Sequence, residues 1–351
     1  MNHRRMTKPV RIGSVTVGGQ LPIVVQSMTK TDTRDIISTI NQIKELEEYG
    51  CELIRVAIPD KEAAEAIRSI KRGITIPLVA DIHFDYRLAL ASLKAGADGL
   101  RLNPGNIGNP ENIKLIAQTA KARGIPIRIG VNAGSLPRSS NTRLSIAQQM
   151  VDTALHQIKL LESLDFDLIK VSLKAFDVPT TIAAYQSIAK TTPYPLHIGI
   201  TESGPMRNGI IRSTVGIGTL LYLGLGDTIR VSLSAHPKEE VIAAYEILKS
   251  LNLRQHGPVL VSCPSCGRCS VDIIKLAEEV AIRLSKIKKP VKVAVMGCVV
   301  NGPGEAKDAD IGIACSKSKA TIFKKGKMVG MIEDKNFVTA LMEEVEKMDV
   351  S

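Results

Sequence analysis

The sequence predicts a parallel (β/α)8 barrel, or TIM barrel, followed by a smaller α+β domain. Short runs of β-branched residues alternate with segments of helical periodicity through residues 23–250. Eight such pairs fit the roughly 250 residues that a TIM barrel needs. Beyond residue 251 the alternation changes, and five of the six cysteines lie there. An open doubly wound sheet is the alternative, but no glycine-rich phosphate-binding loop follows the first predicted strand.

Each barrel strand is predicted from a short run rich in Val, Ile and Leu, and each helix from apolar residues spaced three and four apart. The strands are predicted at 23–26, 53–57, 77–81, 99–103, 126–131, 168–173, 196–200 and 228–233. The helices that follow them are predicted at 34–49, 61–72, 86–96, 110–123, 144–163, 179–191, 212–223 and 237–250. A hairpin over 10–25, turning at Gly18 and Gly19, is expected to plug the N-terminal mouth of the barrel.

The chain is expected to divide into a barrel over 1–251, a linker over 252–258 and a C-terminal domain over 259–351. The linker is expected because residues 252–258 are polar and end in Gly-Pro. In the C-terminal domain, strands are predicted at 259–262, 291–296 and 311–315, helices at 271–286 and 334–347, and a hairpin around 324–327.

Composition favours a folded protein of the cytoplasm. The mean hydropathy is +0.08 and 44% of residues are hydrophobic, without an apolar run of the roughly 18 residues that span a bilayer. The basic segment 1–11 is not followed by the apolar region of a secretory signal, so no membrane association and a cytoplasmic location are expected.

The net charge of +11 indicates an anionic partner. Nucleic acid is not favoured, because the chain has no Trp, six Tyr and five Phe and therefore few side chains on which bases stack. An acidic membrane surface and a phosphorylated small molecule are the other anionic partners, and charge alone does not choose between them.

Several predicted strands place polar residues where a barrel interior is normally apolar. In the strand at 126–131, Ile127, Ile129 and Val131 alternate with Arg128 and Gly130, and the strands at 99–103, 168–173 and 228–233 repeat this pattern. The apolar set is expected to face the helices, which turns the polar set inward, at the C-terminal mouth. The inward cations predicted in this way are Arg55, Arg101, Arg128, Lys170, Lys174 and Arg230.

These cations exceed the acidic groups expected near them, which are Asp81 and Glu202. A buried cation without a partner costs several kcal/mol, so a ligand with two or more negative charges is expected among them. Arg binds phosphate oxygens through two donors at once, which favours a phosphate or diphosphate substrate. Strand-end residues in solvent are the alternative for any single member.

Two residues are candidates for moving protons. His83 follows Asp81 at the mouth and has a near-neutral ordinary pKa. Glu202, just beyond the seventh strand, is expected in a water-poor mouth that raises its pKa. For His83 a structural, hydrogen-bonded role is the alternative.

The cysteines form the strongest local pattern. Cys263, Cys266 and Cys269 share one loop, and Cys298 follows a later strand. Thiolates select zinc, copper(I) or iron–sulfur clusters, and these four are compatible with a structural zinc site. An iron–sulfur cluster held by three thiolates leaves one iron for an exchangeable ligand, for which Glu305 is the candidate. Cys51 and Cys315 are expected to be buried apolar residues.

Three segments give a specific resemblance. Val25-Gln-Ser-Met28, Cys263-Pro-Ser-Cys-Gly-Arg268 and Met296-Gly-Cys-Val-Val-Asn-Gly-Pro-Gly-Glu305 resemble the flavodoxin- or ferredoxin-dependent 4-hydroxy-3-methylbut-2-enyl diphosphate synthases, in their two-domain bacterial form. The resemblance implies a [4Fe-4S] enzyme of isoprenoid biosynthesis by the methylerythritol phosphate pathway. Its substrate would be 2-C-methyl-D-erythritol 2,4-cyclodiphosphate, and flavodoxin or ferredoxin would donate the electrons.

The resemblance also implies roles for individual residues. The cluster ligands would be Cys263, Cys266, Cys298 and Glu305, with Glu202 as acid/base and His83 nearby. Cys269 departs from the family's pattern and puts the fourth ligand in question. The residues implied to bind substrate are Arg55, Arg101, Asn103, Arg128, Asn132, Lys174, Arg230 and Ser232.

A head-to-tail homodimer is expected from helix length. The helix at 237–250 returns about 20 Å toward the bottom of the barrel at 1.5 Å per residue, so a short linker starts the C-terminal domain far from its own barrel mouth. A partner's mouth is then easier to reach. The competing functions are a barrel transferase for a phosphorylated or pterin substrate with a structural zinc module, and a basic RNA-binding protein with a zinc ribbon.

Overall fold

The computed structural model describes residues 4–102, 107, 109–136, 144–285, 287–298, 304, 306–333 and 336–348. Its internal contacts divide the chain into two compact units, Met1–Arg254 and Gln255–Ser351.

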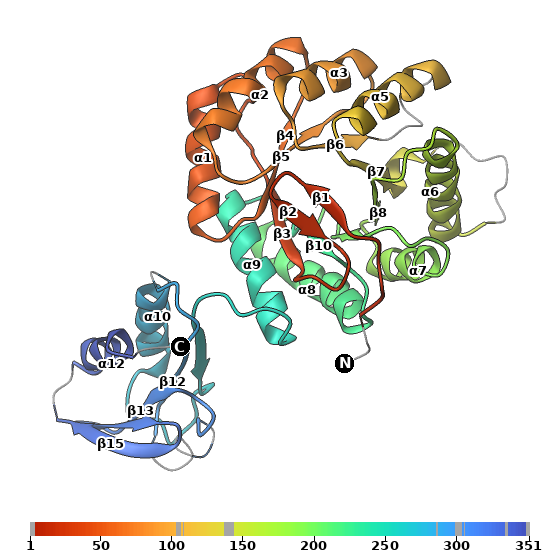
Figure 1. Cartoon of the computed structure of the whole chain (residues 1–351). Coiled ribbons are helices and arrows are strands. Elements are labelled where there is room, and N and C mark those ends of the chain that lie inside the picture. The colour runs from red at the N-terminus through yellow and green to blue at the C-terminus, as the bar shows by residue number, and fades with distance from the viewer. Residues whose placement is uncertain are drawn as a thin grey trace. The chain divides into compact units, whose positions relative to one another are not determined.

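The first unit is the predicted barrel of eight parallel strands (Figure 1). The order around the barrel is β8-β7-β6-β5-β4-β3-β10-β9, and a bridge between Val171 and Leu196 joins β8 to the segment before β9. The strands are β3 (Val24–Met28), β4 (Leu53–Ala57), β5 (Leu78–Asp81), β6 (Gly99–Leu102), β7 (Ile127–Asn132), β8 (Ile169–Lys174), β9 (His197–Ile198) and β10 (Thr228–Ile229).

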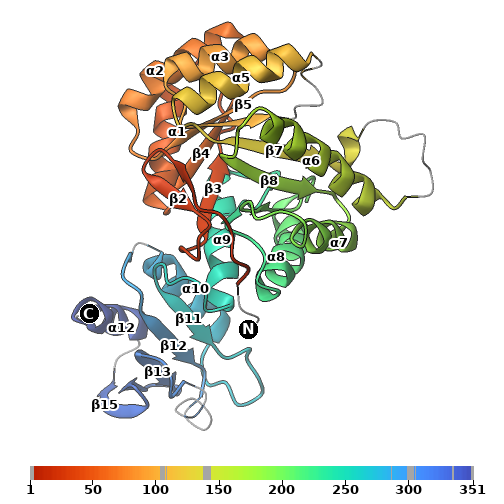
Figure 2. The same cartoon turned by 45° about the vertical axis from the view of Figure 1, so that its right-hand side comes forward.

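Helices surround the strands (Figure 2). Most begin at an Asp, Asn or Ser whose side chain accepts a hydrogen bond from a free backbone N–H of the first turn, as Asp60 does from Ala63. Their apolar faces and the outward residues of the strands form one core. The helices are α1 (Ile36–Glu48), α2 (Lys61–Gly73), α3 (Tyr86–Ala95), α5 (Pro110–Ala122), α6 (Ile146–Ser163), α7 (Val178–Ile188), α8 (Met206–Tyr222) and α9 (Pro237–Ser250), with a 3-10 turn η1 (Ala133–Ser135) after β7.

An N-terminal hairpin closes the barrel's N-terminal end, but its predicted turn was wrong. The hairpin consists of β1 (Val10–Ile12) and β2 (Val15–Val17) and turns at Gly13, whose φ of +56° suits a glycine. Its buried residues pack against Val24, Leu53 and Val79, the first inward residues of β3, β4 and β5. The hairpin therefore closes the barrel interior with apolar side chains at its N-terminal end.

Three other elements of the barrel differ clearly from their predicted bounds. The strands predicted at 196–200 and 228–233 keep only two residues each. Just beyond them the backbones lie close together, since a Cβ on Gly199 would lie 2.5 Å from the carbonyl oxygen of Arg230. Helix α8 begins at Met206 instead of residue 212, since Pro205 provides its start. Gly209, which hides the helical pattern in the sequence, packs tightly against Leu233 there.

The second unit is a five-stranded mixed sheet in the order β11-β12-β13-β14-β15. β11, β12 and β13 are parallel, and the last two strands are antiparallel. Helices α10 and α12 pack with the sheet in one apolar cluster. The elements are β11 (Val259–Ser262), α10 (Ile273–Leu284), β12 (Lys292–Met296), β13 (Ile311–Cys315), β14 (Ala320–Lys324), β15 (Lys327–Ile332) and α12 (Phe337–Glu346).

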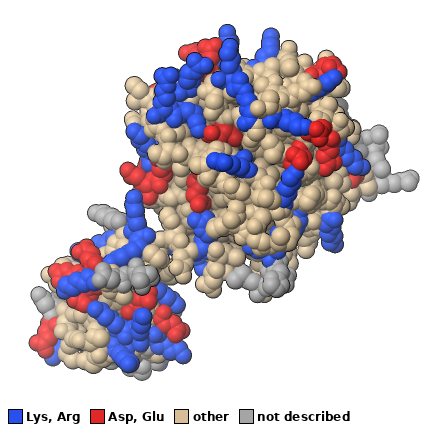
Figure 3. Space-filling model, in the orientation of Figure 1, with Lys and Arg blue, Asp and Glu red and all other residues tan. Residues whose placement is uncertain are grey.

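Positive and negative side chains are mixed on one face of the barrel unit. On the face shown in Figure 3, acidic side chains lie among the lysines and arginines of the barrel unit. In the described segments, no helix combines the length and the apolar character that crossing a membrane requires.

Candidate active site

Charged residues occupy paired positions on neighbouring strands inside the barrel. Strand register pairs Asp81 of β5 with Arg101 of β6, Arg101 with Arg128 of β7, and Arg128 with Lys170 of β8. The residues on either side of these four belong to the core under the helices, so the four side chains face the barrel axis. The alternation read from the sequence thus predicts the inward set.

All six cations are in the interior, but they do not all lie at the mouth. Arg101, Arg128, Lys170 and Lys174 are 7%, 4%, 3% and 6% exposed, so solvent does not stabilise their charges. The predicted position late in each strand was wrong for Arg128 and Lys170, each the second residue of a six-residue strand. The cations therefore form a column that reaches into the middle of the barrel.

Two carboxylates serve this column. Asp81 lies 3.2 Å from Nη1 of Arg101 and 3.5 Å from Nε of Arg55. Burial alone raises the pKa of Asp81, but the surrounding cations, Arg55 first, lower it to about 2. Glu240, 1% exposed on α9, lies 3.4 Å from Nη2 of Arg230. In the described segments these are the only acids that form ion pairs with the six cations, so positive charge is in excess.

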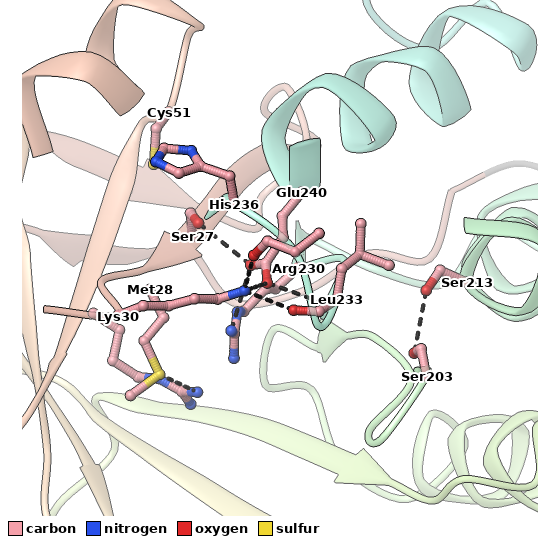
Figure 4. A network of polar contacts seen from close by, with 12 residues as sticks. Ser27, Met28, Lys30, Cys51, Ser203, Ser213, Arg230, Leu233, His236 and Glu240 are labelled. Carbon is pink, nitrogen blue, oxygen red and sulfur yellow. Dashed lines mark hydrogen bonds and ion pairs between the residues drawn. The ribbon is translucent and has the colours of Figure 1, made fainter. Parts of the chain in front are cut away.

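Glu240 is a site residue that sequence reasoning missed. Its carboxylate accepts a hydrogen bond from the backbone N–H of Leu233 at 3.0 Å and lies 3.4 Å from Nζ of Lys30 (Figure 4). It thereby ties the loops after β3 and β10 to the start of α9. Its neighbour Glu239 is also acidic, so nothing in the helical pattern distinguishes the two.

Arg128 and Lys174 contact neutral acceptors instead of carboxylates. Nη1 of Arg128 donates to Oγ of Ser172 at 2.7 Å. Arg55, besides its ion pair with Asp81, donates to the thioether sulfur of Met28. Nζ of Lys174 lies 3.2 Å from Nε2 of His197. Neutral acceptors orient a cation and leave its charge uncompensated.

Several donors in this region have no partner among the described residues. They are Nε and Nη2 of Arg128, Nζ of Lys170, and Nε of Arg101 and Arg230. Burial, reinforced by neighbouring cations, lowers the pKa of Arg128, Lys170 and Lys174 well below their usual values. Each unpartnered buried donor costs about 1–3 kcal/mol, which an anionic ligand would recover.

Replacing Lys170 by methionine is expected to raise the free energy of unfolding by about 1–3 kcal/mol in ligand-free protein. The pKa of Lys170 is lowered in the folded state, so the unfolded chain binds more protons between that value and 10.5. Wild-type stability therefore rises with pH across this window, by up to about 1.4 kcal/mol per unit. The gain in Lys170→Met should be larger at about pH 6 than at about pH 9 in denaturant unfolding. Exposed Lys159→Met is the control, and an equal gain at both pH values would contradict the expectation.

Two inward glycines make room for the cations. A Cβ on Gly130 would lie 2.7 Å from Nε of Arg101, and one on Gly199 would lie 2.9 Å from Nζ of Lys174. Both glycines occupy inward positions, where a larger side chain would compete with the long cations for space. Alternation along the strand predicts that these positions face inward. Only the positions of Arg101 and Lys174 in the folded protein explain why both residues are glycine.

Gly130→Ala is expected to weaken binding of inorganic diphosphate about tenfold, because the new methyl group displaces the Arg101 guanidinium and its charge-assisted hydrogen bonds. The same displacement strains the buried ion pair of Arg101 with Asp81, so the free energy of unfolding should fall by about 1–3 kcal/mol. Titration calorimetry and denaturant unfolding measure the two quantities. Gly134→Ala, where a Cβ meets open space, is the control. Unchanged affinity would argue against the position assigned to Arg101.

Three of the remaining predicted residues lie at the C-terminal mouth with different exposures. His83 is half-exposed, 3.8 Å from Asp81 and 3.5 Å from Nη1 of Arg101. Asn132 ends β7 and Ser232 follows β10, both partly buried. Asn103 lies outside the described residues.

The barrel unit alone does not give Glu202 the expected environment. Its side chain is exposed, on a loop residue with a φ of +56°, so the barrel unit alone does not hold it in a water-poor place. Glu240, not Glu202, is the second acid beside the cations.

The cysteine loop lies at the ends of two paired parallel strands. Cys263 follows β11 and Cys298 follows β12 by two residues. The N–H of Gly297 donates to Sγ of Cys263 at 3.3 Å, and the N–H of Cys269 donates to the carbonyl of Cys266 at 2.9 Å. A thiolate that accepts a backbone N–H suits a thiolate-bound metal group, so the donor set fits an iron–sulfur cluster or zinc.

The cysteines do not by themselves form a complete ligand set. No group of three His, Cys, Asp or Glu side chains among the described residues is arranged to hold a metal ion, and Glu305 lies outside these residues. Cys269 lies in the loop before α10, with its sulfur against Gly297. Cys51 and Cys315 are buried as predicted, and burial raises the pKa of each to about 12.

Sequence comparison decides the family. Residues 7–245 match the GcpE TIM-barrel domain, and residues 259–347 match the GcpE protein C-terminal domain. The chain belongs to the GcpE family. Similar relatives named 4-hydroxy-3-methylbut-2-en-1-yl diphosphate synthase (flavodoxin) come from Dehalococcoides mccartyi, 64% identical over 97% of this chain and 98% of the relative, and from Caldanaerobacter subterraneus, 54% identical over 98% of each chain. The resemblance stated from the three sequence segments is thus confirmed.

Solved structures agree with the barrel of this GcpE-family chain. Dihydropteroate synthases from Stenotrophomonas maltophilia and Yersinia pestis match 70% of it with TM-scores of 0.53 and 0.52, over 98% and 99% of their own chains. Their identity to this chain is 12%, so the likeness shows the fold alone. The alternative of a barrel transferase is not favoured, because full-length relatives carry the synthase name.

Proposed function

We propose that this protein converts 2-C-methyl-D-erythritol 2,4-cyclodiphosphate to 4-hydroxy-3-methylbut-2-enyl diphosphate. The reaction adds two electrons and two protons, opens the ring at a carbon–oxygen bond to the diphosphate, and releases one hydroxyl oxygen as water. The observation that supports this function is the buried column of six cations with two paired acids and several unpartnered donors. A doubly phosphorylated ring supplies the missing negative charge.

The barrel's contribution is binding, orientation and charge. The guanidinium groups hold the diphosphate through paired hydrogen bonds, and the excess positive charge stabilises the phosphate oxygen that becomes free when the ring opens. The proposed substrate-binding residues are Arg55, Arg101, Asn103, Arg128, Asn132, Lys174, Arg230 and Ser232.

The electrons require a redox group that the C-terminal domain would hold. Cys263, Cys266 and Cys298 are the proposed thiolate ligands of a [4Fe-4S] cluster, with Glu305 as the fourth ligand. The cluster, when bound, supplies electrons one at a time. Flavodoxin, which the names of the relatives specify, is the proposed electron donor.

Proton transfer is assigned to Glu202, with His83 beside the substrate. Glu202 donates a proton to the departing hydroxyl group, and His83, next to Asp81 and Arg101, helps to fix the substrate at the mouth. Because Glu202 is exposed in the barrel unit, its role requires a cover over the mouth. The cover proposed here is the C-terminal domain of a second copy in a head-to-tail homodimer.

Anaerobic purification followed by turnover tests this function. The expected protein is brown, contains iron and sulfide in equal amounts, and produces the linear diphosphate from the cyclic one when reduced flavodoxin is added. A colourless protein with only zinc, or a cluster-containing protein that leaves the cyclic diphosphate unchanged, would contradict it.

A further inference from the structure

We infer that His197 is a positioning residue for the proposed substrate site: as a neutral acceptor it holds the Lys174 ammonium in place for the diphosphate without cancelling its charge. The inference rests on the proposed function and adds a residue to it. His197 is the inward residue of β9 and is 1% exposed. Its side chain therefore meets the interior of the barrel and not solvent.

The contacts of His197 fix its protonation pattern. Nζ of Lys174, a donor without acceptor capacity when charged, lies 3.2 Å from Nε2. With Lys174 charged, Nε2 is the accepting nitrogen and Nδ1 carries the proton. Nδ1 lies 2.8 Å from Oγ1 of Thr228, which can accept that proton in a hydrogen bond. Thr228 thus holds the ring so that its accepting edge faces Lys174.

A neutral acceptor has an advantage over a carboxylate at this position. Asp81 and Glu240 orient Arg55, Arg101 and Arg230 but also offset their charge. His197 uses one ammonium hydrogen of Lys174 and leaves the others for an anion. Burial and nearby cations lower the pKa of His197 well below its usual value, so the ring stays neutral beside Lys174.

The shape of the site supports the same placement. A Cβ on Gly199 would lie 2.9 Å from Nζ and 3.4 Å from Cε of Lys174, so the end of the lysine lies against the backbone next to His197. Lys174 is 6% exposed, and this confinement leaves few other positions for its ammonium group. Loss of the acceptor would leave a buried, unpartnered cation.

Binding of inorganic diphosphate, measured by titration calorimetry, tests the inference. His197→Leu is expected to weaken binding about tenfold, whereas His197→Gln, whose amide oxygen replaces Nε2 as acceptor, should stay within about threefold of wild type. Lys174→Met should weaken binding at least as much as His197→Leu. In the Lys174→Met background, His197→Leu should change the affinity by less than about twofold, because the residue acts through Lys174.

The double variant separates positioning from general damage. Equal additional losses from His197→Leu with and without Lys174 would overturn the inference, because a merely structural role does not depend on the lysine. Equal binding by wild type and His197→Leu would also overturn it and leave the proposed function standing. If wild-type protein bound no diphosphate, the proposed function and this inference would both be wrong. Circular dichroism of each variant confirms that the barrel has folded.

Discussion

Replacing Arg128 by methionine is expected to weaken binding of the cyclic diphosphate about 100-fold while stabilising the ligand-free barrel. Hydrogen bonds to charged groups contribute about 1.5–3 kcal/mol each, and Arg128 offers two unpartnered donors to a ligand. The same two donors destabilise the empty protein by about 1–3 kcal/mol each, and a methionine of similar shape removes that cost. Calorimetric titration measures the expected loss of affinity, and denaturant unfolding measures the expected gain in the free energy of unfolding.

A loss of affinity together with a gain of stability distinguishes a binding site from a structural ion network. If Arg128 served the fold, its removal would leave other charges unpaired and would lower stability. Arg68→Met, an exposed arginine on α2, is the control and should change neither quantity measurably. A less stable Arg128→Met with unchanged affinity would contradict the assignment.

The second large effect concerns the cysteine loop. Cys266→Ser is expected to yield protein with little iron and sulfide, without the brown absorption of a cluster, and with turnover at the detection limit, because serine is a poor ligand for iron in such clusters. Diphosphate binding to the barrel should remain within about threefold of wild type, since the cations are unaffected.

Cys51→Ala provides the matched control. This cysteine is buried in the barrel core, where its thiol donates to the carbonyl of Leu53 at 3.1 Å. The variant should keep full iron content and colour. Retention of the cluster in Cys266→Ser, or its loss in Cys51→Ala, would refute the ligand assignment.

Much of the fold and the inward set could be predicted from alternation along the strands. In a strand where Ile127 and Ile129 alternate with Arg128, either the isoleucines or the arginine can face the helices. The helices pack through apolar faces, so the isoleucines face them and Arg128 points into the barrel. The same rule applied to the seventh strand would have marked His197 and Gly199. The rule does not give the position of a side chain along the barrel axis, however, so Arg128 and Lys170 were predicted too near the mouth.

Contacts from other elements could not be predicted in this way. Glu240 reaches Arg230 from α9, and its choice over Glu239 depends on how the helix packs. Glu202 lies in a loop and has a φ of +56°, and neither its conformation nor its exposure can be read from a periodic pattern. The positions of Glu240 and Glu202 depend on how a helix and a loop pack against the barrel, and no periodic pattern in the sequence describes that packing.

The most direct test of the central claim is a crystal structure of the protein with the cyclic diphosphate bound. The account predicts both phosphate groups inside the C-terminal mouth of the barrel, with oxygens in contact with Arg128, Lys174 and other members of the cation column. Phosphates bound elsewhere, or a column whose cations keep only their protein partners while substrate is present, would contradict it.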